Sequence, residues 1–416
     1  MPFIPGISEG PTQTSRDTWD IYKEHKIYGP LDLLQMAHNP LTSTSDYTQD
    51  TQIMESHYIS HEPTVLFGRI RRLVPPLLEK FHKGQHGRVA VIGGSTDYTG
   101  APTFSAMASG ALGCDMNHVL CEKSAAPAIK SYSPDLMVHP LLPSSNTTED
   151  AGSINAKDLA GPIINMLARL HCLVIGPGLG TDPVTSEVVS EVMQEARGRS
   201  IPFVLDADGL KLVNKRPGLV KGYRECILTP NVVELARLAE SVGVDMQKIK
   251  RECSDSMDSR AKDAEVCRRL SEALGGVTIV RKGPYDVISN GIASLIQENE
   301  GGLKRSGGQG DTLTGSLGTL MGWRAAYHDK LWDSGEKDER QETSRKEGIE
   351  REIQSEVSLS PATSRLLVAW AGSGITRECS RRAYEAKGRS MQASDLTAQV
   401  HDSFLALVGE PEASKL

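Results

Sequence analysis

Short apolar runs that alternate with longer helix-like stretches constrain this chain more than any other feature. Several runs are apolar over four or five consecutive residues, which is typical of strands covered on both faces. The stretches between them predict helices over 102–113, 184–197, 232–242 and 261–274. The eight runs predicted as strands are Arg88–Ile92, Asn117–Cys121, Leu136–Leu142, Cys172–Ile175, Phe203–Leu205, Cys226–Leu228, Val277–Val280 and Tyr285–Ser289.

This alternation predicts an α/β fold in which a mostly parallel central sheet carries helices on both sides. In such sheets a ligand binds beyond the carboxyl ends of the strands. Glycines and acidic residues follow several of the predicted strands, so this edge of the sheet is the expected functional site.

The alternation of predicted strands and helices begins after an N-terminal segment and is interrupted once by a charged stretch. Residues 1–60 are rich in Thr, Ser, Pro, Asp and His and lack a sustained period, which predicts a poorly ordered N-terminal arm. Residues 61–416 are predicted to form a single domain. Within it, 16 of the 28 positions over 329–356 are Asp, Glu, Lys or Arg. This composition favours a solvated surface excursion, with a regulatory or docking insert as the alternative. Helices are expected to resume over 362–387 and 394–407.

Composition narrows the class of protein. Lys and Arg number 46 and Asp and Glu 53, a net charge of −7, so no nucleic-acid partner is expected. No apolar run reaches the length of a membrane span. The seven cysteines include no C-x-x-C pair and are predicted to be buried in a reducing compartment. The first residues lack the apolar core of a secretory signal and include Glu9, Asp17 and Asp20, which favours a cytoplasmic protein.

The strongest chemical signal is the glycine-rich stretch from Arg305 to Gly315, which precedes a helix of small residues. Bare backbone amides that lead into a helix N-terminus form an anion site, which can hold the terminal phosphate of a nucleotide. Asp311 follows the glycines directly and is the candidate base toward a hydroxyl nucleophile, whereas a plain N-cap is the alternative. No Walker A loop is present.

Other polar residues at strand ends have two interpretations each. Lys282 and Asp286 could hold a nucleotide's phosphates and ribose, or form the charged tip of a hairpin. Asp206 and Asp208 could face a phosphate-bound magnesium ion, or serve as turn formers. Asn231 and Glu234 could face the same crevice or simply cap a helix; these alternatives stay open.

The loop from Gly93 to Pro102 lacks the G-x-G-x-x-G spacing of a dinucleotide fingerprint, which argues against a Rossmann dehydrogenase. It is interpreted instead as a substrate-side loop that covers a bound ring. The histidines show no metal-ligand spacing and no serine-nucleophile elbow occurs, so the metal ligands stay unassigned.

Together these motifs resemble the ATP-dependent (S)-NAD(P)H-hydrate dehydratases, in the stand-alone eukaryotic form. The resemblance extends from about Phe67 to Glu410. It rests on the order of Lys83-Gly-x-x-Gly-Arg88, Ile92-Gly-Gly-Ser, Tyr98-Thr-Gly-Ala-Pro102, Gly176-Pro-Gly-Leu-Gly180, Asp206-Ala-Asp-Gly209, Leu228-Thr-Pro-Asn231, Lys282-Gly-x-x-Asp286 and Gly307-Gly-Gln-Gly-Asp311.

The resemblance implies a ribokinase-like three-layer α/β/α sandwich and a repair reaction on hydrated NADH and NADPH. ATP and Mg²⁺ are the implied co-substrate and cofactor, and a homo-oligomer is a possible assembly. Asp311 is the implied catalytic base. Substrate contacts are implied for Gly180, Asn231, Val232, Val233, Glu234, Leu235, Ala236, Arg237 and Asp311. ATP contacts are implied for Lys282, Gly283, Pro284, Tyr285 and Asp286 and for Gly301, Gly302, Leu303, Lys304, Arg305, Ser306, Gly307, Gly308, Gln309 and Gly310.

Two other functions remain open on the residues. A small-molecule kinase of the same fold, such as a vitamin-precursor kinase, would share Asp311 and the glycine loop but release a stable phosphorylated product. A non-catalytic nucleotide sensor would bind ATP without turnover.

Overall fold

The computed structural model describes residues 58–145, 155–338 and 343–411. The chain divides into two units, Met1–Ile53 and Met54–Leu416. The first unit, and with it the predicted arm up to residue 57, lies outside the described residues.

One nine-stranded sheet organises this unit, in the order β3-β2-β1-β4-β5-β6-β7-β8-β9. The first seven strands in this order pair in parallel, whereas β8 and β9 pair antiparallel at one edge. The predicted mostly parallel sheet is confirmed. The strands are β1 Arg88–Ile92, β2 Met116–Glu122, β3 Met137–Leu142, β4 Cys172–Ile175, β5 Phe203–Leu205, β6 Cys226–Leu228, β7 Thr278–Arg281, β8 Asp286–Ser289 and β9 Ser294–Gln297.

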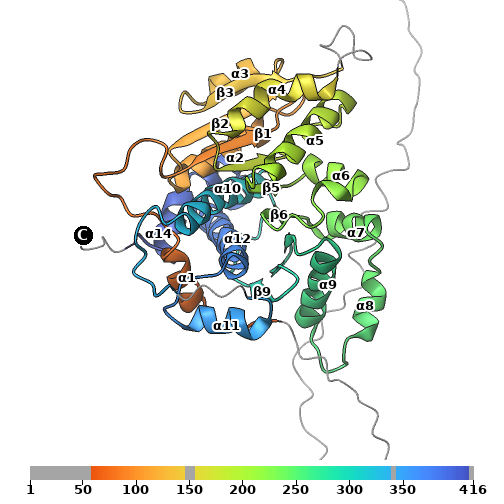
Figure 1. Cartoon of the computed structure of the whole chain (residues 1–416), viewed down its shortest axis with the longest axis vertical. Helices are drawn as coiled ribbons and strands as arrows, with labels where there is room; N and C mark the ends of the chain where they lie inside the picture. Colours follow the sequence, from red (N-terminus) through yellow and green to blue (C-terminus); the bar gives the residue numbers. More distant parts are fainter. Residues whose placement is uncertain (1–57, 146–154, 339–342, 412–416) are drawn as a thin grey trace, which may run out of the picture. The chain divides into compact units, whose positions relative to one another are not determined.

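Two layers of helices cover the sheet. They are α1 Pro63–Arg71, α2 Gly100–Leu112, α3 Ala126–Tyr132, α4 Ala156–Leu167, α5 Pro183–Gly198, α6 Asp208–Lys215, α7 Val232–Ser241, α8 Met246–Glu252, α9 Ser259–Ala273, α10 Gln309–His328, α11 Lys346–Gln354, α12 Pro361–Lys387, α13 Ala393–Thr397 and α14 Val400–Leu407. Figure 1 shows α4 to α9 following one side of the sheet, with α10, α12 and α14 on the other.

Alternation along each strand divides the core between the two layers. In β4, Cys172 and Val174 belong to the apolar cluster beneath α2, α10 and α12, whereas Leu173 and Ile175 belong to the cluster beneath α4 to α9. Neighbouring side chains on a strand point to opposite faces, and helices cover both faces of the sheet. All four residues are therefore fully buried. The expected three-layer sandwich is thus confirmed.

The sequence analysis did not predict the last strand of the antiparallel edge, nor the packing of the first described residues on that edge. Strand β9 was missed. It pairs with β8 and also receives the segment before α1, since Tyr58 bridges to Ser294 and the Ile59 amide donates to the Ser294 carbonyl at 2.8 Å. Ile59 is 1% exposed. Residues 58 and 59, placed in the arm on sequence grounds, therefore pack on the sheet.

The charged stretch over 329–356 is more than a solvated excursion. It contains α11, in which Ile349 and Ile353 are fully buried against α1 and α12. The Glu352 carboxylate accepts the Ser360 amide at 2.9 Å and so joins α11 to the start of α12. The stretch lies between α10 and α12 as expected, but two apolar residues four apart dock one face of its charged helix on the core.

The remaining sequence expectations are met with small differences. The helix predicted over 394–407 divides into α13 and α14, and the cap of α13 is Gln392, whose amide bonds to Asp395 at 2.9 Å. All seven cysteines are buried free thiols. No helix among the described residues combines the length and apolar character needed to cross a bilayer.

Candidate active site

The glycine-rich loop before α10 delivers Asp311 to the carboxyl edge of the sheet. Gly308 precedes the helix with φ +91°, a conformation that favours glycine, and a side chain there would collide with Ala393 of α13. At Gly310 a Cβ atom would lie 2.8 Å from the Asp206 carboxylate. The glycines thus allow α10 to begin close to the acidic residue that follows β5, with Asp311 in its first turn.

A lysine and three carboxylates share this edge. The Lys282 Nζ atom donates to Asp206 Oδ1 at 2.7 Å and lies 3.9 Å from Glu234 Oε2. Burial opposes the charge of Lys282, but Asp206, with smaller contributions from Glu234 and Asp311, holds the pKa of Lys282 above its usual value. The lysine therefore stays cationic in the centre of the cluster.

Asp311 is the perturbed acid of the cluster. Burial, and then the negative charge of Asp206, raise the pKa of Asp311 to about 7, although Lys282 acts in the opposite direction. A carboxylate with a pKa near neutrality can take up a proton at physiological pH and return it, as a general base must. The arrangement supports acid–base chemistry rather than a plain helix cap, since Asp311 accepts no capping hydrogen bond in α10.

The loops after β1 and β4 form one wall beside this cluster. Gly178, with φ +61°, lies so close to Tyr98 that a Cβ atom would be 2.8 Å from the Tyr98 carbonyl oxygen. Gly180, with φ +78°, donates its amide to Asp208 Oδ2 at 2.9 Å. Asp208 also pairs with Lys211, so this aspartate positions the glycine loop.

The start of α7 is a capping box that also faces the site. Asn231 Oδ1 accepts the amides of Val233 and Glu234 at 2.9 Å each, and Glu234 Oε2 accepts the Asn231 amide at 2.7 Å. Asn231 bridges to Lys282 on the neighbouring strand end. The same contacts therefore do two things: they cap α7, and they place the Glu234 side chain beside Lys282 at the edge of the site.

The side chains of the first α7 turns differ in what they can contact. Val232 and Val233 are 51% and 58% exposed. Ala236 and Arg237 are also exposed. Leu235, in contrast, lies in the core beneath the helix at 2% exposure. Any contact of Leu235 with a ligand would have to come from its backbone.

The turn from Lys282 to Asp286 is a hairpin between β7 and β8. Asp286 accepts the Gly283 amide at 2.8 Å and the Ser373 hydroxyl at 2.6 Å. Arg377 of α12 pairs with the same carboxylate at 3.3 Å. Tyr285 donates its hydroxyl to Asp263 at 2.8 Å. Asp286 and Tyr285 thus hold the turn in place through their side chains.

The stretch from Gly301 to Gly310 is tied to the C-terminal helices. Lys304 Nζ donates to the carbonyl oxygens of Arg389 and Met391, both at 2.6 Å. Gln309 Nε2 donates to Ser380 Oγ at 3.1 Å. Ser306 Oγ is buried and has no hydrogen-bond partner within the described chain. A buried hydroxyl without a partner is uncommon in folded proteins, so this one is a candidate donor to a ligand.

The sequence predicted the residues of the candidate site but not all of the residues that hold them in position. Ser373 and Arg377, which hold the 282–286 turn, lie in the middle of a long helix and carry no motif. Within the described residues no group of three or more His, Cys, Asp or Glu is arranged to hold a metal ion by itself.

The sheet order, the glycine loop and the acid in the first turn of the following helix define the ribokinase-like class of fold. A ribokinase-like superfamily protein from Enterococcus faecalis superposes with a TM-score of 0.55 at 16% identity, over 85% of this chain and 96% of that one. An ADP/ATP-dependent NAD(P)H-hydrate dehydratase from Bacillus subtilis, co-crystallised with ATP/Mg²⁺, gives 0.51 at 16% identity, over 81% and 96%. At this identity the likeness concerns the fold alone.

Sequence comparison is more specific. A family model described as NAD(P)H-hydrate dehydratase matches residues 89–339. An ATP-dependent (S)-NAD(P)H-hydrate dehydratase from Emericella nidulans is 65% identical over 86% of this chain and 98% of that protein. The mouse protein of the same description is 40% identical over 82% and 85%. The chain belongs to the NAD(P)H-hydrate dehydratase family.

Proposed function

We propose that this chain dehydrates the S epimer of hydrated NADH and NADPH, consuming ATP and releasing NAD(P)H, ADP and phosphate. The observation that carries the proposal is the position of Asp311. It is a half-buried carboxyl group with a pKa of about 7 at the end of a glycine loop, beside Lys282. Membership of the family named for this reaction supports the choice of substrate.

In the first step Asp311 takes the proton of the ring hydroxyl, and the hydroxyl oxygen attacks the γ-phosphorus of ATP. A new oxygen–phosphorus bond forms while the bond to the β-phosphate breaks, so ADP leaves. The amides of Gly307, Gly308 and Gly310 and the N-terminus of α10 stabilise the charge on the transferred group. Ser306 Oγ would add a further donor.

In the second step the bond between the ring carbon and the phosphate oxygen breaks, and the neighbouring ring carbon gives a proton to the departing phosphate. The electron pair of that carbon–hydrogen bond becomes the ring double bond, which restores the dihydronicotinamide. Phosphate is a far better leaving group than hydroxide, and this difference is the role of ATP in the reaction. Lys282 remains paired with Asp206 and adds positive charge close to the developing anion.

Magnesium would be held jointly by the ATP phosphates and by one protein carboxylate, as is usual for this ion. Glu234 fits that requirement, because its Oε1 atom makes no hydrogen bond within the described residues and its side chain is 24% exposed beside Lys282. The ion would neutralise charge on the phosphates.

The decisive experiment incubates the purified full chain with ATP, Mg²⁺ and the S hydrate. We expect the absorbance band of the reduced nicotinamide to recover, with one ADP formed for each molecule restored. A phosphorylated alcohol that persists without recovery of the band would identify a vitamin-precursor type of kinase instead. ATP binding without ADP formation would identify a sensor.

We also propose that residues 61–416 carry the whole activity and that the protein is cytoplasmic. The buried free thiols are compatible with a reducing compartment. Activity of a chain that begins at Met54, compared with the full chain, tests the first statement. Fractionation of cells tests the second.

A further inference from the structure

A cavity of about 480 Å³ opens at the amino ends of the strands, at the opposite end of the sheet from Asp311. Its lining includes Arg224, just before β6, and Gly276, just before β7. The carboxyl ends of these two strands lead instead to Asn231 and Lys282. The cavity is therefore separate from the candidate active site.

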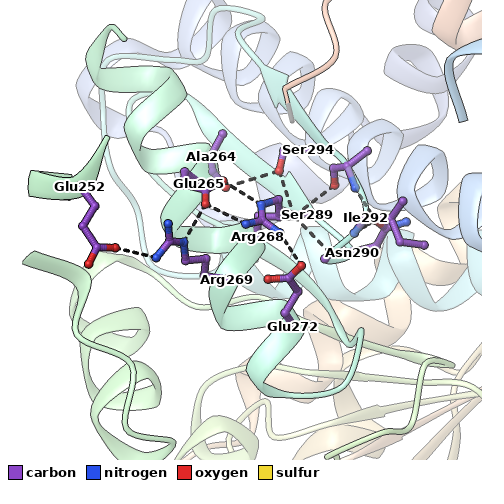
Figure 2. Close-up of polar contacts among 12 residues, drawn as sticks. Glu252, Ala264, Glu265, Arg268, Arg269, Glu272, Ser289, Asn290, Ile292 and Ser294 are labelled. Atoms are coloured by element: carbon purple, nitrogen blue, oxygen red, sulfur yellow. Dashed lines mark hydrogen bonds and ion pairs between the residues drawn. The ribbon is translucent and has the colours of Figure 1, made fainter. Parts of the chain in front are cut away.

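The cavity has a defined floor. Asn290, 2% exposed, forms the turn between β8 and β9, and its Oδ1 atom accepts the amides of Ile292 and Ala293 at 3.0 Å each. Its Nδ2 atom donates to the Ala362 carbonyl at 3.1 Å, which ties the turn to the first turn of α12. Figure 2 shows this turn next to the charged face of α9. The lining is thus held in place without a ligand.

Positive charge dominates the lining, although the whole chain is acidic. Five cationic side chains line the cavity, against the two carboxylates of Glu272 and Glu347: Arg224, Arg268, Arg345, Lys346 and Arg365. Figure 2 shows that Arg268 is already paired with Glu265 and Glu272. Lys346, which the figure does not label, pairs with Glu350 at 3.5 Å.

Arg224 and Arg345, unlike Arg268 and Lys346, have no carboxylate partner in the described part of the chain. Both side chains are exposed, and neither makes an ion pair or hydrogen bond with any described residue. They come from segments more than a hundred positions apart, the loop before β6 and the start of α11. Two unpaired guanidinium groups thus line the same cavity from two sides.

Arg365 contributes a buried charge. It is 3% exposed, its Nε atom donates to Thr278 at 3.2 Å, and its Nη1 atom donates to Glu225 at 3.0 Å. Its Nη2 atom has no hydrogen-bond partner in the described chain. Glu225 is shared with Arg324, so one carboxylate serves two buried guanidiniums. An anion in the cavity would satisfy the remaining donor.

From this arrangement we propose that the cavity binds a small anion that carries a phosphate group. Arginine presents a planar fork of donors that matches phosphate oxygens, and three arginines here have donors to spare. A volume of about 480 Å³ lies within the range of small-molecule sites and leaves room for an organic group attached to the phosphate. The start of α11 supplies Arg345, which gives the charged stretch over 329–356 a function in binding.

The test uses inorganic pyrophosphate as the probe, titrated against the full chain without magnesium while its melting temperature and the heat of binding are recorded. The variant Arg224→Ala/Arg345→Ala removes the two exposed charges. The matched control is Lys330→Ala/Lys337→Ala, which removes the same charge from exposed positions outside the cavity lining. Both variants keep the candidate active site intact.

We expect pyrophosphate to raise the melting temperature of the wild type and of the control equally. The arginine variant should bind the probe at least about tenfold more weakly, because two charge-assisted contacts are lost. Equal binding by all three proteins, or no binding by the wild type, would overturn the proposal. Melting of each protein without the probe shows that the substitutions leave the fold intact.

Discussion

Two charged clusters lie at opposite ends of the sheet, and they differ in which sign is in excess. At the carboxyl ends, Asp206 and Asp311 share the charge of Lys282, and burial and the adjacent Asp206 raise the pKa of Asp311 to about 7. The excess is negative, and a carboxyl group that titrates near neutrality can exchange a proton with a substrate.

At the amino ends the signs are reversed. Arg324 and Arg365 are both 3% exposed and share the single carboxylate of Glu225. Burial, and then the neighbouring Arg324, lower the pKa of Arg365 to about 10. Arg365 nevertheless stays charged at every physiological pH. Similar crowding of charge thus produces a proton carrier from a carboxylate but only an anion-binding group from an arginine.

The largest effect is expected from removing the proton carrier of the acidic cluster. Asp311→Asn keeps the size of the side chain but cannot accept the proton, so we expect kcat to fall by about 10²–10⁴-fold. Isothermal titration should show that ATP binding is retained. Asp255→Asn, an exposed acid outside both clusters, is the matched control and should be fully active. Unchanged turnover in Asp311→Asn would remove this residue from the chemistry.

A substitution in the cluster at the amino ends of the strands should lower the stability of the fold and leave turnover unchanged. Glu225→Gln leaves two buried guanidiniums without a counter-charge, and we expect the free energy of unfolding to fall by about 3 kcal/mol. Equilibrium urea unfolding measures the loss. The control is Glu195→Gln, whose partner Arg199 is exposed, for which the loss should be at most about 0.5 kcal/mol. Equal losses would show that the shared carboxylate matters no more than a surface pair.

The pH dependence of the rate sharpens the role of Asp206. The ionised form of Asp311 is the base, so kcat/KM should fall as pH drops below about 7. Asp206→Asn removes a negative neighbour that favours the protonated form of Asp311. The acid limb should therefore move to lower pH by about one unit. A limb that stays in place, or moves upward, would show that Asp206 does not set the pKa of Asp311.

The smallest expected effect concerns the orphaned hydroxyl of the glycine loop. If Ser306 donates to the ATP phosphates, Ser306→Ala should raise the KM for ATP by about three- to tenfold and leave kcat nearly unchanged. Initial rates at varied ATP measure the change. The control is Ser358→Ala, which removes another buried hydroxyl that lacks a partner but lies far along the chain from the loop. The same KM in both variants would contradict the contact.

Sequence reasoning predicted the buried parallel strands best. The limits of β1, β4, β5 and β6 agree with the structure at both ends, because a strand covered on both faces has an unbroken apolar run. Strand β9 was missed, since only two of the four residues from Ser294 to Gln297 are strongly apolar and the strand lies at an antiparallel edge.

The site was predictable as a set of residue types and not as a set of contacts. The glycines before α10 and the acid that follows them carry a mechanism that can be inferred locally. In contrast, the pairing of Lys282 with Asp206 joins positions 76 residues apart, and no local pattern encodes it. The shift in the pKa of Asp311 depends on that same distant carboxylate, so it required the three-dimensional structure.

The burial of every cysteine has a chemical consequence for a protein that would work on coenzymes of electron transfer. Burial raises the pKa of Cys121, Cys267 and Cys379 to about 12. At neutral pH these thiols hold almost no thiolate, the form that peroxides and electrophiles attack. The folded chain should therefore withstand oxidising conditions without loss of its cysteines.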